Sequence, residues 1–462
     1  MAEGWKRKWS PAGKNSKLSH IPVLEVQPFR PEKEIQWTLP ISKSHALRYL
    51  LLAAQSENVV RFIQMENAGE DIVAMKDCLV QLGVKIIEKN GDWEVHGVGP
   101  HGFSPSKTVL NARNSGVTLR CLLALCSRIE GVSMLDGDSS LRNRPHNEIL
   151  QTLEQLGIVI SVGEREEALP VLFNGIQLDN ATISIDGSTS SQPITAWICT
   201  SPGFSSGLEI RLSGDLVSTR HSQLSIDLAK THGADILMEE QKIVIRPWVP
   251  DFSDDASKIT IPSDASMFSF ALLTAKVLNT NIHVENIPEN FESIGHELLY
   301  EKSTSFGLKI DGPLISHLSD SYDTEFDLID ANDLITPLSA ILALSNGGRI
   351  SSIQHAQHKE SNRIKSTIAL LNQFGLQANV TEEGHLSIPG GQTLETPTNL
   401  VRTYLDHRIQ MTAMILALGC NERVLIEGSE LHKVADPDAI NRLKISGAAI
   451  KQTLLNPNEP HP

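Results

Sequence analysis

The stretch LVQLGVKI, residues 79–86, decides the fold, because its pattern returns five more times along the chain. It has the form of a helix end, a glycine and the start of a strand. Its counterparts are LEQLGIVI (153–160), AKTHGADI (229–236), STSFGLKI (303–310), LNQFGLQANV (371–380) and RLKISGAAI (442–450). The glycines Gly83, Gly157, Gly233, Gly307, Gly375 and Gly447 are separated by 74, 76, 74, 68 and 72 residues. This near-constant period predicts six similar structural units.

Each glycine of the repeat stands where a helix commonly ends in a left-handed residue, and residues that favour strands follow it. Each unit also holds a second, mostly apolar helix, which we expect to be buried while the first helix faces solvent. The apolar segments lie at 45–55, 118–128, 193–201, 267–278, 337–348 and 409–419. Helix–glycine–strand junctions are common in α/β proteins, but that explains one instance better than six at this spacing.

At 462 residues the chain is too long for one ordinary core and favours two or three domains, and six units grouped in threes give two domains of similar size. A segment rich in Pro, Asp and Ser at 247–262 lies near the midpoint and predicts a crossover between them. With 40% hydrophobic and 21% charged residues the composition is that of a globular protein. No apolar run is long enough for a membrane-spanning helix.

Charge and cysteine content exclude several classes of protein. The net charge of −15 argues against a general nucleic-acid binder, although it leaves room for a local basic pocket. Five cysteines without metal-ligand spacing indicate neither a zinc site nor a disulfide framework, so we expect a cytoplasmic protein. Residues 1–20 are basic and lack the apolar core of a secretory signal. We interpret them as a flexible tail, with an organelle-targeting segment as the alternative.

Polar residues gather where the apolar helices begin, and a helix N-terminus is a ready site for an anion. Cations are unfavourable there unless a bound anion offsets the repulsion from the helix dipole. Lys43, Lys359, Arg363 and Arg408 all stand near such positions. Each motif alone also fits an ordinary helix cap or a solvated charge. The combination predicts a buried, phosphorylated carboxylic acid as the substrate.

The same residues resemble the 5-enolpyruvylshikimate-3-phosphate (EPSP) synthase family of enolpyruvyl transferases, in order along most of the chain. The matching segments are ISKSHALR (41–48), the NSG of residues 114–116, LRNRPHNEILQTLEQLG (141–157), IDGSTSSQ (185–192), DLVSTRHSQ (215–223), HKESNR (358–363), TYLDHR (403–408) and ELHKVADPD (430–438). No single segment carries the resemblance, which makes it specific.

The resemblance implies a two-domain, inside-out α/β fold with six repeated βαβαββ-type units, three in each domain. It implies that the chain begins in one domain, forms the other completely and then returns. We therefore expect an N-terminal substrate domain at 41–261, a C-terminal domain made of 21–40 and 262–462, and two hinge crossovers near 40 and 261. We also expect a monomer that has no nucleic-acid or membrane partner.

The implied reaction, a step of the shikimate pathway to aromatic amino acids, is transfer of the enolpyruvyl group of phosphoenolpyruvate (PEP) to the 5-hydroxyl of shikimate 3-phosphate, with release of phosphate. The resemblance implies no metal or organic cofactor. The matching positions for PEP are Lys43, Asn114, Gly116, Arg144, Gln192, Arg363, Arg408 and Lys433. Those for shikimate 3-phosphate are Lys43, Ser44, Arg48, Ser190, Ser191, Gln192, Ser218, His221 and Lys359. For catalysis, Lys43 contacts both substrates, and Glu360 or Lys433 protonates the PEP methylene.

The pattern departs from the family at one catalytic position. The family has an aspartate in an Asn-x-x-x-Asp segment, and aligning DANDLITPLSA (330–340) on Asn332 puts Thr336 there. A threonine hydroxyl is no base near neutral pH, and Asp333 replaces it only if the loop takes another register. His221, Gln357 and Asn362 are further departures, at positions where the family has a tyrosine, a basic residue and an aspartate.

Besides the reaction of the EPSP synthase family itself, three other readings are considered. The chain is a diverged paralogue with another cyclic acceptor or another reaction, or it is a non-catalytic anion-binding protein that retains the pocket. The related UDP-N-acetylglucosamine enolpyruvyl transferases carry a loop cysteine five residues before an Arg-Pro pair. Ser139 holds that position here, which argues against that third reading.

Overall fold

Six apolar helices form the interior of the protein, as the repeats predict. The computed structural model describes residues 20–163, 169–176, 178–253 and 258–456, so the predicted basic tail lies outside the described residues, apart from His20. The six helices are α1 (Lys43–Gln55), α3 (Gly116–Cys126), α6 (Gln192–Thr200), α8 (Phe268–Leu278), α10 (Ile335–Ala343) and α12 (His407–Gly419). Nearly every residue in them is buried, because they are apolar around most of their circumference.

The other helix of each unit, which is not apolar all round, ends at the repeated glycine, and that prediction is confirmed. These helices are α2 (Glu70–Gln81), α5 (Asn147–Gln155), α7 (Thr219–Thr231), the short α9 (Leu298–Glu301) with the 3-10 turn Ser303–Phe306, α11 (Arg363–Gln373) and α13 (Ala439–Ile445). All six glycines have positive φ, from 73° to 107°. This is the left-handed conformation that ends a helix and that glycine adopts without steric cost.

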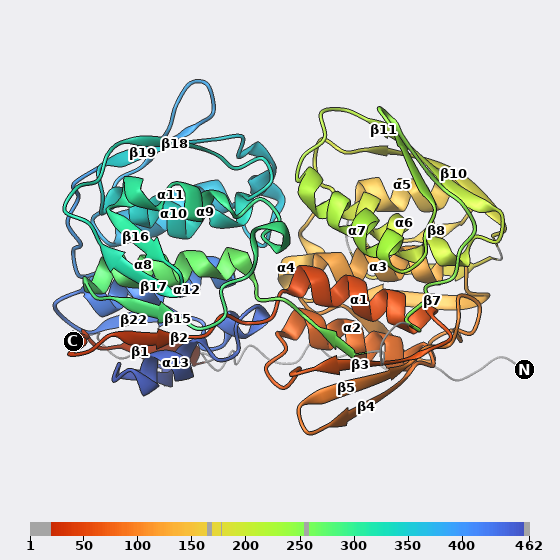
Figure 1. Ribbon diagram of the computed structural model, residues 1–462, viewed down its shortest axis with the longest axis horizontal. Helices are drawn as coiled ribbons and strands as arrows, with labels where there is room; N and C mark the ends of the chain where they lie inside the picture. Colours follow the sequence, from red (N-terminus) through yellow and green to blue (C-terminus); the bar gives the residue numbers. More distant parts are fainter. Residues whose placement is uncertain (1–19, 164–168, 177, 254–257, 457–462) are drawn as a thin grey trace, which may run out of the picture.

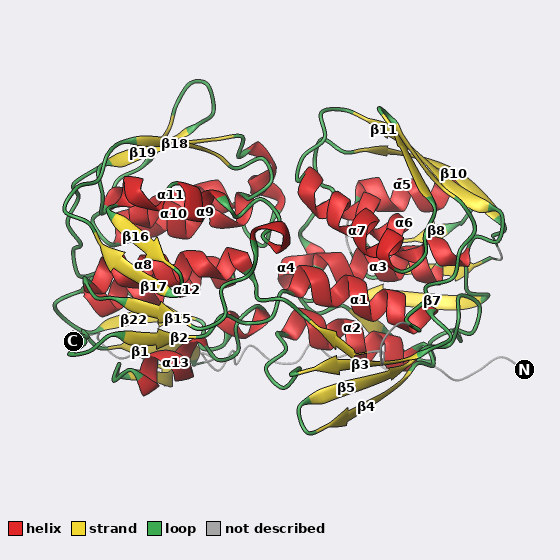
Figure 2. Cartoon of the chain, in the orientation of Figure 1, coloured by secondary structure: helices red, strands yellow, loops and turns green. Residues whose placement is uncertain are grey.

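Each unit adds a small sheet on the outside of its helices (Figures 1 and 2). Five sheets share one pattern, in which a parallel pair of strands is followed by two antiparallel pairs. Three of them belong to the first half: β14 (Lys258–Thr260), β3 (Val59–Ile63), β5 (Asp92–His96) and β4 (Lys85–Lys89); β6 (Leu110–Asn111), β7 (Gly131–Asp136), β9 (Val171–Gly175) and β8 (Ile160–Ser161); β10 (Asn180–Asp186), β11 (Gly207–Ser213), β13 (Lys242–Ile245) and β12 (Ile236–Glu239).

The other sheets belong to the second half: β2 (Ile35–Trp37), β15 (Ile282–Val284), β17 (Leu314–His317) and β16 (Leu308–Asp311); β18 (Thr324–Asp327), β19 (Gly347–Ser351), β21 (Leu386–Pro389) and β20 (Asn379–Val380); β22 (Val424–Glu427), β1 (Ile21–Val26) and β23 (Ile450–Leu455). The last sheet has three strands, but Val401 makes a parallel bridge to Ile426 beside it. The sixth unit thus has the same pattern and borrows β1 from the start of the chain.

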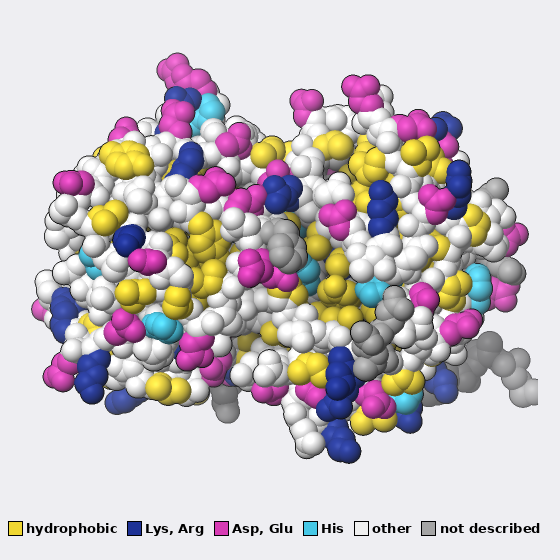
Figure 3. All heavy atoms as spheres, in the orientation of Figure 1, with side chains coloured by type: hydrophobic (Ala, Val, Ile, Leu, Met, Phe, Trp, Pro, Cys, Tyr) yellow, Lys and Arg dark blue, Asp and Glu magenta, His cyan; other side chains and the backbone are white. Residues whose placement is uncertain are grey.

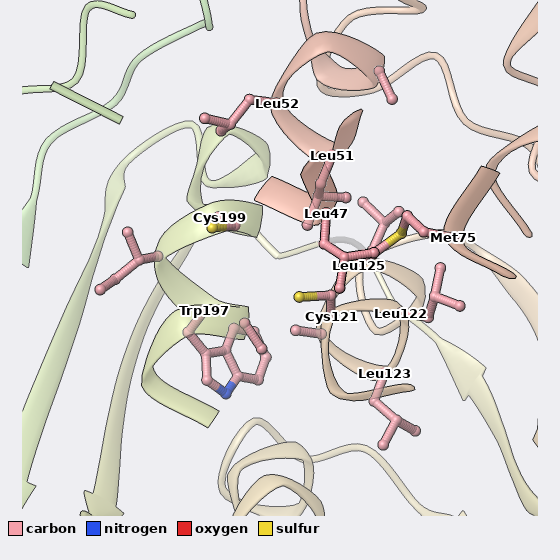
Figure 4. Close-up of a cluster of buried hydrophobic side chains, with 14 of the residues drawn as sticks. Leu47, Leu51, Leu52, Met75, Cys121, Leu122, Leu123, Leu125, Trp197 and Cys199 are labelled. Atoms are coloured by element: carbon pink, nitrogen blue, oxygen red, sulfur yellow. The ribbon is translucent and has the colours of Figure 1, made fainter. Parts of the chain in front are cut away.

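The described hydrophobic residues form two separate cores, one in each half of Figure 1. Helices α1, α3 and α6 meet in the first core, where Leu47, Leu51, Cys121, Leu125 and Trp197 lie close together (Figure 4). The indole nitrogen of Trp197 donates to Thr152 Oγ1 at 2.9 Å, so its one polar atom is satisfied. Helices α8, α10 and α12 make the second core in the same way.

The chain passes twice between the halves, along two segments that lie side by side. Ser42 N donates to Pro262 O at 2.7 Å, and Asp264 N donates to Pro40 O at 2.8 Å. The first core takes its residues from Ala46 to Ile261, and the second takes them from both sides of that range. On this basis we keep residues 40 and 261 as the proposed hinges and 41–261 as the proposed N-terminal domain.

Gly157 should matter for stability through backbone conformation alone. Gly157 has φ +79°, and a Cβ added there would have no heavy atom within 4 Å. We expect Gly157→Ala to lower the free energy of unfolding by about 1–2 kcal/mol, because alanine is strained in the left-handed region. Gly157→Asn should lose less, since asparagine tolerates that region. Urea unfolding followed by circular dichroism measures both, and equal losses would contradict the explanation.

Candidate active site

A cavity, partly open to solvent, lies between the two halves and is lined by residues of both. The residues predicted for the site that line it are Lys43, Ser44, Arg48, Gly116, Arg144, Ser190, Ser191, Gln192, Ser218, His221, Lys359 and Glu360. On the face seen in Figure 3, charged side chains of both signs are scattered over both halves. In the lining of the cavity, by contrast, charged side chains lie close together.

Four helix starts of the first half converge on this cavity. Lys43 is the first residue of α1, Gly116 of α3 and Gln192 of α6, while Ser218 precedes α7. Serine side chains cap α1 and α3: Ser42 Oγ accepts from His45 N, and Ser115 Oγ from Thr118 N. The unpaired backbone N–H groups and the helix dipoles favour an anion here.

One side of the cavity is held in place by Arg48, which is almost completely buried. Its Nε donates to Ser225 Oγ at 2.8 Å, and its Nη2 donates to Thr195 Oγ1 at 3.1 Å and to the backbone oxygen of His221 at 2.8 Å. These bonds tie α1 to α6 and α7. Ser218 has φ +52°, a conformation that is uncommon for a residue with a side chain and often marks a functional position.

The opposite side of the cavity contains Arg144 and Arg120. Arg144 Nη2 donates to Asn114 Oδ1 at 2.7 Å, so Asn114 supports Arg144 from behind and does not itself line the cavity. Arg120 Nη1 donates to Gln192 Oε1 at 2.7 Å. The Nε atoms of both arginines are buried without a partner among the described residues. The sequence prediction did not include Arg120 among the substrate residues, although its position four residues after Gly116 was a usable signal.

Beside the cavity lies an arginine–carboxylate cluster made of Arg363, Arg408, Asp333, Glu360 and Asp406, of which only Asp333 and Glu360 line the cavity. Arg363 Nη1 lies 2.7 Å from Asp333 Oδ1, its Nε lies 3.1 Å from Asp406 Oδ2, and its Nη2 pairs with Glu360. Arg408 Nη2 lies 3.4 Å from Asp333 Oδ2. The side chains of Arg363 and Arg408 are 0% and 1% exposed, so neither arginine lines the main cavity.

The cluster fixes the charge of its carboxylates. Burial by itself would raise the pKa of Asp333, but Arg408, Lys359, Arg363 and Lys43 outweigh it and hold the pKa well below its usual range. Burial likewise opposes ionisation of Glu360, and Arg363, Arg144, His407 and Lys43 together hold its pKa well below the ordinary value. Both carboxylates are therefore charged in this arrangement.

The pKa values of the two lysines of the cavity shift in opposite directions. Burial dominates at Lys359 and lowers its pKa. At Lys43 burial is outweighed by Asp71, Glu360 and Asp333, so the pKa is raised, and Lys43 Nζ lies 3.1 Å from Asp71 Oδ2. Lys43 is thus a fixed positive charge, while Lys359 gives up a proton more easily than a free lysine.

Thr336 is not part of the cavity, which corrects the sequence alignment. It is 0% exposed inside α10, and its hydroxyl lies 2.8 Å from Thr367 Oγ1. Asp333, three residues earlier on the 3-10 turn Asn332–Leu334, lines the cavity instead. The alignment matched Asn332 to the asparagine of the family and therefore put Thr336 at the catalytic position. The 3-10 turn before α10 instead places Asp333, and not Thr336, in the lining of the cavity.

Lys433 also lies outside the cavity. Its side chain is 37% exposed, and its ammonium group pairs with Glu430, three residues earlier. The segment packs against the start of α2, where a Cβ on Gly69 would lie 2.6 Å from Val434 O. In this arrangement Lys433 is a residue of the contact between the halves.

The halves touch directly around the cavity. Ser140 Oγ donates to Glu360 O at 3.0 Å on one side. On the other side Asp330 Oδ1 accepts from Thr219 Oγ1 at 3.2 Å and from Arg220 N at 3.1 Å. Closure of this kind excludes water and strengthens electrostatic interactions inside the cavity.

The described part of the chain has neither a clustered metal site nor a membrane-spanning helix. No group of three or more His, Cys, Asp or Glu side chains within the described ranges has the arrangement of a metal site. No helix in those ranges is long and apolar enough to cross a membrane.

Comparison with known proteins gives one family. The family model described as EPSP synthase (3-phosphoshikimate 1-carboxyvinyltransferase) matches residues 30–443. A protein named 3-phosphoshikimate 1-carboxyvinyltransferase from Methanocorpusculum labreanum is 28% identical, over 89% of this chain and 96% of its own length. A protein of the same name from Methanothermobacter thermautotrophicus is 26% identical, over 87% and 94%.

A solved structure supports the fold. EPSP synthase from Acinetobacter baumannii superimposes with a TM-score of 0.70, covering 94% of this chain and all of its own, at 21% sequence identity. The predicted two-domain enolpyruvyl transferase fold is thus confirmed.

The arginine–carboxylate cluster should be essential for stability. We expect Arg363→Gln to lower the free energy of unfolding by about 3–5 kcal/mol, because it leaves buried carboxylates uncompensated. Arg349→Gln, at a half-exposed arginine 4.0 Å from Glu325, is the matched control and should change it by no more than about 0.5 kcal/mol. Urea unfolding of both variants checks this, and equal losses would contradict it.

Proposed function

The chain belongs to the EPSP synthase family and is a transferase, and from this premise we propose that it transfers the enolpyruvyl group of PEP to the 5-hydroxyl of shikimate 3-phosphate, releasing phosphate. The observation that carries the proposal is the meeting, in one cavity, of four helix starts of the first half with cations from both halves. The chain as a whole has a charge of −15, so this local concentration of cations is unusual for it and suits an anionic ligand.

We assign the acceptor to the side of the cavity formed by α1, α6 and α7. Its phosphate would bind Ser190, Ser191 and Ser218, where hydroxyl groups and the start of α7 meet. Its carboxylate would bind Ser44 and Arg48. The bonds that hold Arg48 in place support this role, because a pre-positioned guanidinium loses little entropy on binding.

The donor would lie on the other side, above the arginine–carboxylate cluster. Its phosphate fits near Lys43, Gly116, Arg144 and Gln192, and Gly116 lets a ligand approach the backbone closely. Its carboxylate would go to Arg363 and Arg408, whose forked donors match that group. Arg120, which holds Gln192, joins this set by position.

The chemistry consists of an addition and an elimination. The donor methylene carbon takes up a proton, and the acceptor 5-hydroxyl oxygen bonds to the adjacent carbon and loses its own proton. In the second step the C–O bond to phosphate breaks, phosphate leaves with the electron pair, and the new methyl group loses a proton to restore the double bond. Glu360 lines the cavity and Lys433 does not, so Glu360 is favoured as the group that handles the methylene proton: as a carboxylate it takes the methyl proton in the elimination, and it returns that proton to the methylene carbon in the addition of the next turnover.

The acceptor proton needs a base, and Asp333 is the residue that we assign to it. It is a carboxylate that lines the same cavity as His221, Lys359 and Ser218. This assignment removes the main argument for a non-catalytic protein, which rested on Thr336. The departure at Asn362 is also conservative, because its side chain caps α11 by accepting from Lys365 N at 3.1 Å.

One departure remains on the acceptor side and supports a second candidate, a changed cyclic acceptor. His221 lines the cavity where the family has a tyrosine, and His355 and His358 line it beside Lys359. Gln357, between those two histidines, does not line it. A series of phosphorylated and unphosphorylated cyclic acids, each incubated with PEP and followed by phosphate release, separates this candidate from the first.

Turnover tests the proposed function directly. We expect the purified protein to release phosphate from shikimate 3-phosphate and PEP at an ordinary enzyme rate. Asp333→Asn should lower kcat by about 10²–10⁴-fold, as loss of a general base does. Thr336→Asp should not raise activity, because the carboxylate would be buried in α10 beside Thr367. A gain with Thr336→Asp, or full activity of Asp333→Asn, would contradict the assignment.

A further inference from the structure

The two arginines best suited to the donor's carboxylate already hold a carboxylate of the protein. Asp333 Oδ1 lies 2.7 Å from Arg363 Nη1, and Asp333 Oδ2 lies 3.4 Å from Arg408 Nη2. Each oxygen of one carboxylate thus meets a different guanidinium. This is the arrangement that a bound substrate carboxylate would adopt.

Asp333 is also the exchangeable member of the cluster. Asp406 is 0% exposed and is fixed, because it accepts from Arg408 N at 2.9 Å and from Ser361 Oγ at 3.0 Å. The side chain of Asp333 is 23% exposed. It lines the main cavity and also a smaller neighbouring one that Arg408 lines. A ligand entering from the main cavity meets Asp333 before it reaches Arg363.

We propose that Asp333 stands in for the donor's carboxylate on Arg363 and Arg408, and that the donor displaces it toward the acceptor hydroxyl. The proposal rests on the proposed function for the identity of the donor, but the exchange concerns any ligand that carries a carboxylate. Donor binding then does two things at once: it fills the arginine pair and it delivers the base.

The surroundings of Asp333 suit such an exchange. The groups that line the main cavity with it include Lys43 and Lys359, so a displaced carboxylate remains among cations. Burial lowers the pKa of His221 far below its ordinary value, and that ring adds no positive charge. The turn carrying Asp333 touches the start of α7, where Asn332 Nδ2 donates to Ser218 Oγ at 3.3 Å. This contact connects the turn to the proposed acceptor phosphate site.

The exchange accounts for how a carboxylate paired with two guanidiniums becomes a base. While Arg363 and Arg408 hold it, Asp333 strongly prefers the charged form and accepts a proton poorly. Once the donor's carboxylate has taken the arginines, only the lysines remain as close cations, and the proton affinity of Asp333 rises. The acceptor hydroxyl is thus deprotonated only when the donor is in place.

The test is whether removing the carboxylate of Asp333 increases the affinity of the protein for PEP. Calorimetric titration with PEP alone compares the wild type with Asp333→Asn. We expect the variant to bind PEP about tenfold more tightly, because a charge-assisted interaction no longer has to be broken first, while its turnover with acceptor is lost. A residue that only supports the cavity, or only touches the substrate, would give unchanged or weaker binding.

Two controls separate exchange from a general charge effect. Glu148→Gln removes one negative charge from the wall of the same cavity, near Arg120 and away from the arginine pair, and should gain much less affinity for PEP. Inorganic phosphate, which lacks a carboxylate, should bind wild type and Asp333→Asn equally. The exchange is wrong if PEP binds Asp333→Asn no better than wild type, or if phosphate or Glu148→Gln shows the same gain.

Further measurements check that the variants are folded and distinguish failure of the exchange from failure of the proposed function. Thermal melting shows whether Asp333→Asn is folded, and Asp333→Ala, which removes the polar group completely, repeats the titration as a second variant. A wild type that binds PEP but does not turn over shikimate 3-phosphate would contradict the proposed function and leave the exchange testable. A wild type that turns over normally, with no gain in either variant, would contradict the exchange alone.

Discussion

The buried guanidinium of Arg363 is the interaction on which the site depends. It has no access to solvent, and it meets Asp333, Glu360 and Asp406, which come from three separate segments of the second half. A buried cation is tolerable only with charged partners, and the carboxylates are tolerable only with the cation. The start of α11, the start of α12 and the turn before α10 are therefore held in one relative position.

That position is transmitted to the other half through Glu360 and the segment around Asp330. The backbone oxygen of Glu360 accepts from Ser140, close to Arg144 in the sequence, and Asp330 caps the start of α7 from across the interface. Opening the halves would break both contacts. The cluster and the anion sites of the first half are thus parts of one mechanical unit, although they lie on different cores.

The six repeats explain why such a site can exist. Each repeat directs the N-terminus of an apolar helix into the interior, and side chains at those ends meet although they are far apart in the sequence. Lys43, Gly116, Gln192 and Ser218 come from different parts of the first half and still line one cavity. The local cost of a cation at a helix start is acceptable because carboxylates or substrate anions lie opposite.

The sequence by itself determined the repeat, the buried and exposed helices and the chemical character of the pocket, because glycine conformation, hydrophobic periodicity and helix-end electrostatics are local properties. Most of the predicted pocket residues did meet in one cavity. The tertiary structure alone decided that Asp333 and not Thr336 faces the cavity, that Asn114 supports Arg144 from behind, and that Lys433 pairs with Glu430 at the rim. Each of these outcomes depends on the geometry of a turn or on contact between the halves, and no periodicity in the sequence encodes either one.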